Sequence, residues 1–569
     1  MSAPPSPHAR DDPGTLPQPG DATSPLWRIW LPISVASVAS GVMLAAGNRD
    51  DARTGDEPVL RLAQANGMAD VETVPAVPPH LVSTVGGGAV AFDANGDGHP
   101  DLYHLGGGAW PWDEPTGRGR SVAGTLLINT GAGSFADQTI SSGLTPTFPG
   151  MAAAAGDFDL DGDPDLAVSG VGGLILYSNN GYGIFTAVPV SAAPAGDDHV
   201  WRAGVTWVDA NADGWPDLVT MTYARWPDEV SLEEAIDVVS GGRSYGTPTG
   251  FLPDFPQVLL NQRDGTFLSA EDHVGLEPID PLTRSPRPWG LAALPLDANG
   301  DSLVDLLLTF AEGSPQLFLA RPGGGFRRAQ PGSEVRREGD GFWMPRVIPG
   351  GDPRSETLLR WAQAMQAGQP TLPAPRGGPN AVDLDWDGQL EAILLGSKLE
   401  AHPSRDLPLE ALSGHLSFAR ERSESWLPVP LQLSNSASVE KPAVSRAAVT
   451  LDFDLDGDED IAVTQLGAAP RLLRNEPRIT LPWVAVQLDV PHSSRSADGS
   501  RVEVVTPRGA WAQTWLPRHD GLGQSVGPLR FGLAADSRVS RIVVRWNDGE
   551  VTTLPTPALN RLHRIVRQR

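Results

Sequence analysis

Six copies of one acidic nonapeptide recur along the chain, and any fold must place them in equivalent positions. The pattern is Asp-x-Asp/Asn-x-Asp, with a further acidic residue at the ninth position. One copy alone would be weak evidence, because acidic turns are common on protein surfaces. Six copies, most of them followed by a short strand-like segment, predict a closed array of similar sheets. The copies span Asp93–Asp101, Asp157–Asp165, Asp209–Asp217, Asp297–Asp305, Asp383–Glu391 and Asp452–Asp460.

The donor atoms at this spacing indicate Ca²⁺. This ion takes six to eight oxygen ligands at roughly 2.3–2.6 Å in a tolerant geometry. Side chains at positions 1, 3 and 5 of a tight loop converge on one point, the backbone carbonyl at position 7 adds a ligand, and the acid at position 9 completes the cage. Glycine at position 6 permits the sharp turn. Five copies have this glycine, whereas the fourth has Ser302, so we expect a strained or weaker loop there.

We therefore predict up to six Ca²⁺ sites, in which the residue at position 7 acts through its backbone carbonyl. The candidate ligands are Asp93, Asn95, Asp97, His99, Asp101, Asp157, Asp159, Asp161, Asp163, Asp165, Asp209, Asn211, Asp213, Trp215, Asp217, Asp297, Asn299, Asp301, Leu303, Asp305, Asp383, Asp385, Asp387, Gln389, Glu391, Asp452, Asp454, Asp456, Asp458 and Asp460.

An EF-hand loop begins in the same way but needs a bidentate Glu at position 12 and a helix on each side. Position 12 is here His104, Val168, Thr220, Leu308, Leu394 or Val463. The segments that follow the loops, such as Asp165-Leu-Ala-Val-Ser, are short and apolar or β-branched, which favours strands. The loops are therefore predicted to lie between strands.

A second element follows several loops. It consists of two apolar residues, any residue, an Asn, a Gly-rich turn and a Phe, as in Leu126-Leu-Ile-Asn129 with Phe135 and Val258-Leu-Leu-Asn261 with Phe267. Each copy reads as a strand followed by a tight turn. High Gly (63) and Pro (54) contents also favour turn-rich all-β structure.

Charge and composition narrow the possible functions. The net charge is −26, and the six nonapeptides alone hold 24 acidic residues, so much of the acidity is concentrated at the predicted sites. An acidic chain with two lysines is a poor binder of nucleic acid. The absence of Cys excludes disulfides, thiol chemistry and Cys-ligated zinc.

The N-terminal region predicts export. Residues 1–25 read as a disordered leader, and residues 26–46 contain an uncharged run from Ile29 to Ala46 that is near the lower limit for a membrane span. This run is either an uncleaved single-pass anchor or a signal segment. Loops without a Glu at position 12 bind Ca²⁺ in the range of extracellular modules, roughly 10⁻⁴–10⁻³ M, which again favours an extracytoplasmic location in the cell envelope or outside the cell.

The rest of the chain divides into three parts. Residues 47–80 read as a linker, residues 81–476 hold the repeats, and residues 477–569 read as a small β domain without metal loops. In this last part we expect strands at Trp483–Val490, Arg501–Thr506 and Leu529–Leu533, and a hairpin over Arg541–Leu554. Intervals of 52–88 residues between loops exceed one four-stranded blade of about 40–50 residues. Insertions at 225–256 and 331–380, the second with a helix over Ser355–Ala367, are expected to account for the excess.

The loops and their trailing strands resemble FG-GAP/VCBS repeats, the blades of integrin-α-like β-propellers. The tail resembles the ASPIC/UnbV domain through Asp498–Val504, Leu529–Leu533 and Arg541–Glu550. Together they resemble the layout of bacterial cartilage-acidic-protein-like proteins. The resemblance implies an all-β fold with a propeller of about seven blades, six of them with calcium loops, and a role in extracellular adhesion or interaction. Glu391 for Asp and Ala534 for Gly depart from the family pattern.

Enzymatic function has two candidate signals. Gly523-Gln-Ser525-Val-Gly527 fits the nucleophile motif Gly-x-Ser-x-Gly, but a nucleophile elbow needs a strand before it and a helix after it, whereas Pro528 and a strand-like segment follow here. A calcium-dependent polysaccharide lyase or a glycan-binding lectin on the same scaffold remains the alternative. The tryptophans that could stack on sugars or fill blade interfaces are Trp110, Trp112, Trp201, Trp207, Trp226, Trp289 and Trp343.

The sequence therefore predicts a non-catalytic interaction module. We expect a protein or glycan partner to bind the two insertions, which carry Trp, Tyr, Phe and Arg, residue types enriched at interfaces. The sequence specifies neither the ligand nor the oligomeric state.

Overall fold

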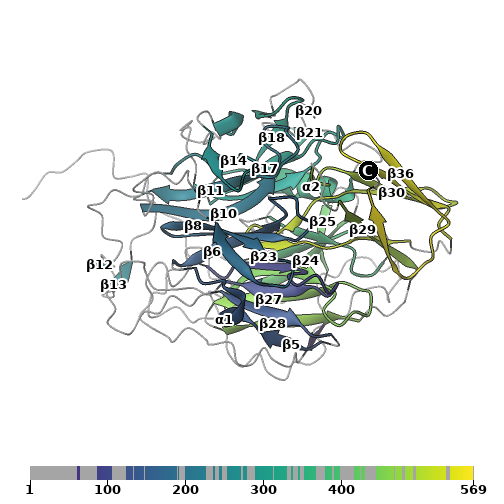
Figure 1. Ribbon diagram of the computed structural model, residues 1–569, viewed down its shortest axis with the longest axis horizontal. Coiled ribbons are helices and arrows are strands. Elements are labelled where there is room, and N and C mark those ends of the chain that lie inside the picture. The colour runs from purple at the N-terminus through teal and green to yellow at the C-terminus, as the bar shows by residue number, and fades with distance from the viewer. Residues whose placement is uncertain are drawn as a thin grey trace, which may run out of the picture. The chain divides into compact units, whose positions relative to one another are not determined.

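Six units of four antiparallel strands account for most of the structure, a computed structural model of the 569-residue chain (Figure 1). Five of these units are separate sheets, and the sixth is part of a six-stranded sheet. The structure describes residues 60–63, 86–105, 124–131, 133–146, 148–188, 190, 199–225, 235–237, 243–245, 253–270, 273–277, 289–311, 313–329, 335–336, 344–345, 352–366, 378–386, 390–396, 415–422, 425–429, 444–466, 468–476, 481–490, 495–533 and 538–567.

Each four-stranded unit is one blade, and each blade has one acidic loop between its first two strands, so blades and loops share the numbers 1 to 6. Blade 1 comprises β2 (Ala89–Phe92), β3 (Asp101–His104), β4 (Thr125–Asn129) and β5 (Phe135–Asp137); blade 2 comprises β6 (Gly150–Gly156), β7 (Asp165–Gly170), β8 (Gly173–Asn179) and β9 (Phe185–Val188); blade 3 comprises β10 (Val200–Val208), β11 (Asp217–Arg225), β14 (Gln257–Asn261) and β15 (Phe267–Ser269). Blade 4 comprises β16 (Gly290–Leu296), β17 (Asp305–Phe310), β18 (Gln316–Ala320) and β19 (Phe326–Arg328); blade 5 comprises β22 (Asn380–Val382), β23 (Glu391–Gly396), β24 (His415–Arg422) and β25 (Ser425–Val429); blade 6 comprises β26 (Val444–Leu451), β27 (Asp460–Leu466), β28 (Ala468–Asn475) and β1 (Leu60–Ala63).

The predicted all-β propeller is confirmed, with six blades among the described residues where the resemblance implied about seven. The additional short elements are α1 (Thr139–Ser142), the 3₁₀ turn His273–Gly275 and two hairpins, β12 (Ala235–Asp237) with β13 (Arg243–Tyr245) and β20 (Val335–Arg336) with β21 (Met344–Pro345). Strand β1 lies within the predicted linker and completes blade 6, where Leu60 is paired with Asn475. A strand from the start of the chain thus completes the last blade.

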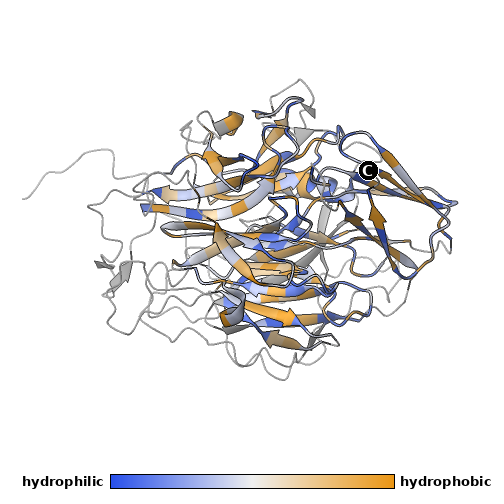
Figure 2. Ribbon diagram, viewed as in Figure 1, coloured by the Kyte–Doolittle hydropathy of each residue, from blue (hydrophilic) through white to orange (hydrophobic). Residues whose placement is uncertain are grey.

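The innermost strands are buried on both faces because neighbouring blades cover them. Strand β6 shows why small side chains are needed there: its sequence is Gly-Met-Ala-Ala-Ala-Ala-Gly, and its first six residues are buried. Hydrophobic segments follow the strands of the sheets, whereas the connecting loops are mostly hydrophilic (Figure 2). Close packing of small residues brings the blades together around a central hydrophobic cluster, and separate clusters lie between blades 1 and 2, 3 and 4, and 5 and 6.

Helix α2 (Pro353–Gln366) lies between blades 4 and 5. The predicted helix is confirmed, with Asp352 capping it: its carboxylate accepts bonds from Ser355 Oγ at 2.9 Å and from Arg354 N at 3.3 Å. The apolar face of α2, including Trp361 at 1% exposure, packs into one cluster with Leu294 of blade 4 and Leu394 of blade 5. Part of the insertion expected to bind a partner therefore fills the core.

Trp361→Ala should lower the free energy of unfolding by about 3–5 kcal/mol, because it removes a fully buried ring between two blades. Chemical denaturation monitored by far-ultraviolet circular dichroism measures this change. Arg360→Ala, on the half-buried face of the same helix, is the control and should cost about 1 kcal/mol or less. Equal, small effects of both substitutions would contradict a structural role for α2.

The tail forms two further sheets. One contains β29 (Trp483–Asp489), β34 (Leu529–Gly532) and β37 (Leu562–Val566), and the other contains β30 (Arg501–Val505), β31 (Ala510–Thr514), β35 (Arg541–Arg545) and β36 (Val551–Pro555). The strands expected from the sequence are present. A hairpin of β32 (Arg518–His519) and β33 (Gly523–Ser525) was not predicted: β33 pairs in parallel with β2 of blade 1.

The predicted anchor or signal, residues 26–46, lies outside the described residues. Within the described part of the chain, no helix has the length and apolarity needed to cross a bilayer.

Candidate metal centres

All six acidic loops occupy the same end of their blades. Each loop follows the innermost strand and precedes the second strand, and the ninth acid is the first residue of that second strand in every blade. Strands flank the loops on both sides, as predicted. The twelfth residues, such as Val168 and Thr220, are fully buried inside the second strands, so an EF-hand is excluded at these loops.

The first carboxylate of a loop fixes the turn through two backbone N–H groups. In loop 2, Asp157 Oδ1 accepts a bond from Asp161 N at 3.1 Å, and Asp157 Oδ2 accepts one from Gly162 N at 3.0 Å. Asp161 Oδ1 in turn accepts a bond from Asp163 N at 2.9 Å. The same bonds recur in loops 1 and 3. The spacing of acids therefore encodes a local turn as well as a set of oxygen donors.

Two backbone positions in the loops are left-handed, and the sequence pattern revealed only one of them. At position 6, Gly162 has φ 103° and Gly457 has φ 107°. Ser302 has φ 67° there, which confirms the expected strain in loop 4, because a Cβ disfavours positive φ. Position 4 also has positive φ in all six loops, including Leu160 at 59° and Leu455 at 62°. Since the residue type at position 4 varies, no sequence signal marked it.

The ninth acid is buried and holds each blade together. In loop 2, Asp165 is fully buried, its Oδ2 accepts a bond from Phe158 N at 3.0 Å, and its Oδ1 accepts one from Asn179 N at 2.8 Å. The equivalent carboxylates in the other five loops also accept the N–H of position 2. One carboxylate thus connects the loop with the third strand of its own blade.

The recurrent asparagine of the third strand connects each loop with the preceding blade. Asn261 is buried in blade 3, and its Nδ2 donates to Pro216 O of its own loop at 3.1 Å and to Phe158 O of loop 2 at 2.8 Å. Asn179 makes the equivalent bond to Ala94 O of loop 1, at 2.8 Å. The remaining copies are Asn129 to Phe453 O at 2.9 Å and Asn475 to Leu384 O at 2.7 Å.

Blade 4 has no asparagine at this position, and another donor replaces it. Ala320 occupies the site and still donates its N–H to the ninth carboxylate of Asp305 at 2.7 Å. Gly325 N makes the bond to the preceding loop instead, donating to Ala210 O at 2.7 Å. These bonds order the blades as 6, 1, 2, 3 and 4, and place blade 5 before blade 6. The sequence showed that these asparagines recur. It did not show which carbonyls they bind, because those carbonyls are distant in the chain.

Asn261→Ala should lower the free energy of unfolding by about 1–3 kcal/mol, because two buried carbonyls lose their donor. Gln262→Ala is the matched control, since Gln262 is the next residue, is exposed, and donates its side-chain Nε2 to the nearby Leu260 O. Urea denaturation compares the two variants. A loss no larger in Asn261→Ala than in Gln262→Ala would show that the inter-blade bond contributes nothing net.

The side chains of three loops already converge as a metal site requires. In each of these loops, one oxygen from each of three acids lies within 4.8 Å of the others: Asp157, Asp159 and Asp165; Asp383, Asp385 and Glu391; Asp452, Asp454 and Asp460. In loop 6 the Oδ1 atoms of Asp452, Asp454 and Asp458 are buried and have no hydrogen-bond donor. Buried, undonated carboxylate oxygens fit a hard cation.

Burial raises the pKa values of several loop acids, and the negative charges of neighbouring acids add to this effect. Burial, followed by the negative charge of Asp161, raises the pKa of Asp157 to about 7. Burial raises the pKa of Asp217 and of Asp305 to about 7 against the effect of their backbone donors. In loop 6, burial raises the pKa of Asp460 to about 9. A bound cation would relieve this repulsion and hold the acids in their charged form.

Metal-free protein should be more stable at about pH 5 than at about pH 8. The raised folded-state pKa values favour proton binding by the native state between the ordinary value of 3.8 and about 7, so stability falls as pH rises through this window. Burial lowers the pKa of His519 to about 3 and that of His104 to about 4, and these two groups act in the opposite direction. Urea denaturation of protein freed of metal by a chelating resin measures the trend. Stability that increases with pH over this window would contradict it.

Within the described residues, the structure brings together nine predicted ligands as converging acid oxygens, three in each of loops 2, 5 and 6. Asp387 and Gln389 lie outside the described residues. Among the residues predicted to act through their carbonyls, His99, Trp215 and Leu303 donate their N–H to the fifth-position carboxylate, which orients the backbone at position 7.

The structure also locates the serine of the Gly-x-Ser-x-Gly motif and some of the tryptophans considered as sugar-binding residues. Ser525 is 2% exposed in strand β33, and its Oγ accepts the N–H of Thr450 at 2.8 Å. Trp201 and Trp207 are buried in the propeller core, in agreement with a filling role. Trp110, Trp112, Trp226 and Trp343 lie outside the described residues.

Two family models match this chain. An FG-GAP-like repeat matches residues 157–220, which contain loops 2 and 3 and strands of blades 2 and 3. An ASPIC and UnbV domain matches residues 490–569, the greater part of the tail. The chain therefore combines an FG-GAP-like repeat with a C-terminal ASPIC/UnbV domain.

The other comparisons add little. No curated protein matches the chain. Among solved structures, the chain is similar to one titled for specific recognition of non-reducing terminal N-acetylglucosamine by an Agrocybe aegerita lectin, at 15% identity over 67% of this chain and 75% of that one. With a TM-score of 0.30, this likeness carries no argument.

Proposed function

We propose that this protein is an exported, calcium-binding FG-GAP propeller that acts as a non-catalytic interaction module for a protein or glycan partner. The observation that carries the calcium assignment is the repetition of one loop architecture at one end of six blades. In it, the first carboxylate fixes the turn and the ninth anchors the blade. FG-GAP-like repeats are a setting in which such loops hold calcium, and the match at residues 157–220 covers two of them.

The donor set favours Ca²⁺ over transition metals. The loops offer carboxylate, amide and carbonyl oxygens, which suit hard cations, and no thiolate exists in the chain. Loops 2, 5 and 6 have the richest acid clusters, so we expect them to bind most tightly. Loops 1, 3 and 4 have Asn at position 3, and loop 4 also has the strained Ser302.

Removing calcium should lower the melting temperature by several degrees. A site filled only in the folded state adds RT ln(1+[L]/Kd), about 2.7 kcal/mol at a hundredfold excess over Kd. Differential scanning fluorimetry in CaCl₂ and in EGTA measures the shift. Asp157→Ala should reduce the calcium-dependent part without abolishing folding, whereas Asp264→Ala, on an exposed turn of blade 3, should leave it unchanged. Identical melting in calcium and in chelator would refute the calcium assignment.

A non-catalytic role is supported by the surroundings of the strongest catalytic signal. Ser525 is buried and engaged with Thr450, and His519 Nε2 lies 3.3 Å from Thr206 Oγ1 and from Gln524 Nε2. Strand β33 pairs with β2, and β34 follows it along the chain. These contacts give the Gly-x-Ser-x-Gly segment a packing role.

We assign partner binding to the face opposite the metal loops. The insertion 226–256 leaves blade 3 at Arg225, the far end of β11 from loop 3, and returns at the start of β14. The two ends meet, because Arg225 Nε lies 3.0 Å from Asp254 Oδ2. Loops on a rigid scaffold are common sites of binding specificity.

Because Arg225 and Asp254 are close together, the segment between them can be replaced by a short linker. Replacing 226–253 by a short Gly-Ser linker should preserve blade 3 and its melting temperature while removing the proposed surface. Capture from cell-envelope extracts, identified by mass spectrometry, would compare the intact protein, the deletion and Trp361→Ala as a control for destabilisation. A partner retained equally by the deletion would exclude this surface.

An oligosaccharide panel, followed for binding and for unsaturated products by ultraviolet absorbance, would reveal a lectin or a lyase.

A further inference from the structure

The C-terminal domain contacts the end of the propeller that carries the metal loops. The ring of Trp483 packs against Gly457 of loop 6 and stacks on Trp386 of loop 5, with ring centroids 5.5 Å apart. Ser496 N donates to Gly214 O of loop 3 at 3.1 Å. Gly499 of this domain also lies against Ser302 of loop 4. Loops 3 to 6 therefore contact this domain within the described residues.

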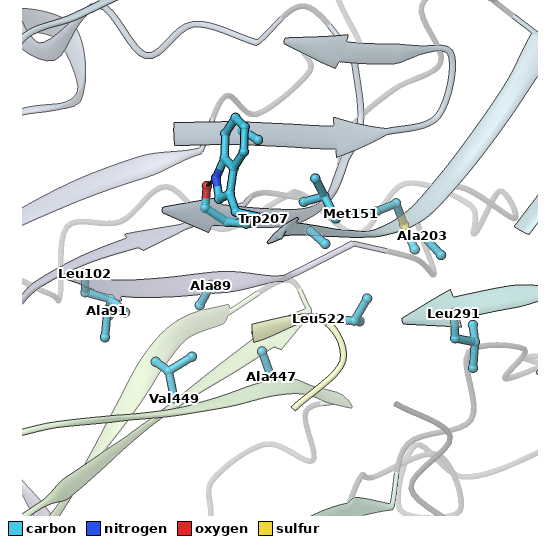
Figure 3. Close-up of a cluster of buried hydrophobic side chains, with 14 of the residues drawn as sticks. Ala89, Ala91, Leu102, Met151, Ala203, Trp207, Leu291, Ala447, Val449 and Leu522 are labelled. Atoms are coloured by element: carbon cyan, nitrogen blue, oxygen red, sulfur yellow. Dashed lines mark hydrogen bonds between the residues drawn. The ribbon is translucent and has the colours of Figure 1, made fainter. Parts of the chain in front are cut away.

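The domain also inserts a hairpin among the innermost strands. Leu522, at the tip before β33, lies in the core cluster with Ala89, Met151, Leu291 and Ala447, which come from blades 1, 2, 4 and 6 (Figure 3). Gly523 is required by this close approach, because a Cβ there would lie 2.8 Å from Val449 Cγ1 and 3.1 Å from Ala447 Cβ. The hairpin is thus part of the propeller core.

Polar bonds fix the hairpin on several blades. Gln524 is fully buried, and its Oε1 accepts a bond from Ala155 N of blade 2 at 2.5 Å. Ser525 accepts a bond from Thr450 N of blade 6, and Val526 N donates to Ala91 O of blade 1 at 2.8 Å. The bond from Val526 N to blade 1 makes amide exchange at the hairpin a measure of docking.

Loop 6 holds the domain through two arginines. Glu459, the eighth residue of loop 6, is 2% exposed and pairs with Arg518 and, at 3.6 Å, with Arg530. Arg530 Nη2 also donates to Asp452 Oδ2 at 2.9 Å, and its Nη1 donates to the carbonyl of Gly457. One guanidinium from the tail thus holds the first, sixth and eighth positions of a single metal loop.

Asp452 leaves one oxygen for a cation. Its Oδ2 binds Arg530, whereas its Oδ1 is buried and receives no hydrogen bond, and Asp452 belongs to the converging set with Asp454 and Asp460. Arg530 and a cation can therefore use different oxygens of the same carboxylate. Arg530 and a cation would each satisfy one oxygen of a buried carboxylate, which is costly to leave without a partner.

We propose that the C-terminal domain docks on the propeller in a calcium-linked manner, with Asp452 bridging the ion in loop 6 and Arg530 of the tail. This inference rests on the proposed calcium function. Calcium fixes the carboxylate that receives Arg530, and Arg530 holds loop 6 in the conformation that binds calcium. By linkage, each therefore strengthens the other by the same factor.

The charges of loop 6 allow calcium and Arg530 to bind this loop at the same time. Six acids lie between Asp452 and Asp460, and three arginines, Arg474, Arg518 and Arg530, pair with members of this group. Carboxylates still outnumber guanidiniums, so a divalent cation adds attraction overall. The tail as a whole has 13 arginines against seven acidic residues, whereas the chain is strongly acidic.

Hydrogen–deuterium exchange with mass spectrometry resolves the hairpin peptide, about residues 516–528, and tests this link in the full-length protein. Exchange is followed across a calcium titration for the wild type, Arg530→Gln, Arg530→Lys and the control Arg545→Gln. Arg545 belongs to the same domain, is 55% exposed and pairs with Glu503 of that domain. Isothermal titration calorimetry on the same samples counts bound calcium independently.

In the wild type and Arg545→Gln we expect EGTA to accelerate exchange of the hairpin about tenfold or more. Arg530→Gln should need about tenfold more calcium for the same protection, with Arg530→Lys between them. Hairpin protection unchanged by EGTA, or tighter calcium binding in Arg530→Gln, would overturn the link while calorimetry still supported calcium binding. Calorimetry that detects no calcium binding would instead defeat the proposed function itself.

Discussion

The structure depends on the hydrogen bonds of the buried ninth carboxylate. In each described loop this group accepts the N–H of position 2, and in five blades it also accepts one from the third strand. A buried carboxylate is costly unless donors surround it. The same residue that completes the predicted metal cage therefore fixes the strands of its own blade. The adjoining asparagine then bonds this blade to the loop of the preceding blade. The predicted metal site and the fold consequently share one set of atoms.

The sequence predicted those parts of the fold that local spacing encodes. The acid spacing located six loops, the apolar runs located the second strands, and the helix over Pro353–Gln366 followed from its periodicity. Non-local contacts could not be predicted in the same way. Leu60–Ala63 reads as linker because its partner strand lies some four hundred residues later, and Gly523–Ser525 reads as loop because β2 supplies its hydrogen bonds. The left-handed conformation at position 4 was not predicted, because the residue type at this position differs between loops.

The apparent catalytic motif shows how a packing requirement can imitate chemistry. Gly523 is glycine because Val449 and Ala447 leave no room for a Cβ, and Ser525 is serine because Thr450 N needs an acceptor in the core. A nucleophile elbow would instead expose the hydroxyl at a strand-to-helix turn. Similarly, Trp201 and Trp207 are large because blade interfaces must be filled, and Trp207 Nε1 is satisfied by Ala154 O at 3.1 Å. The role of such residues can be assigned only when their neighbours in the structure are known.

The junction between blades 4 and 5 explains why tail and propeller form one structure. The other described junctions have a bond from one blade to the preceding loop, whereas here α2 separates the blades. Ser355 Oγ at the start of α2 accepts the N–H of Asp297 at 3.0 Å, and Arg354 donates to Leu516 O of the tail at 3.1 Å. Among the described residues, α2 and the tail therefore supply the contacts at this junction. Through Arg354 the C-terminal domain is bonded to the helix that packs between blades 4 and 5, which ties this domain to the integrity of the propeller.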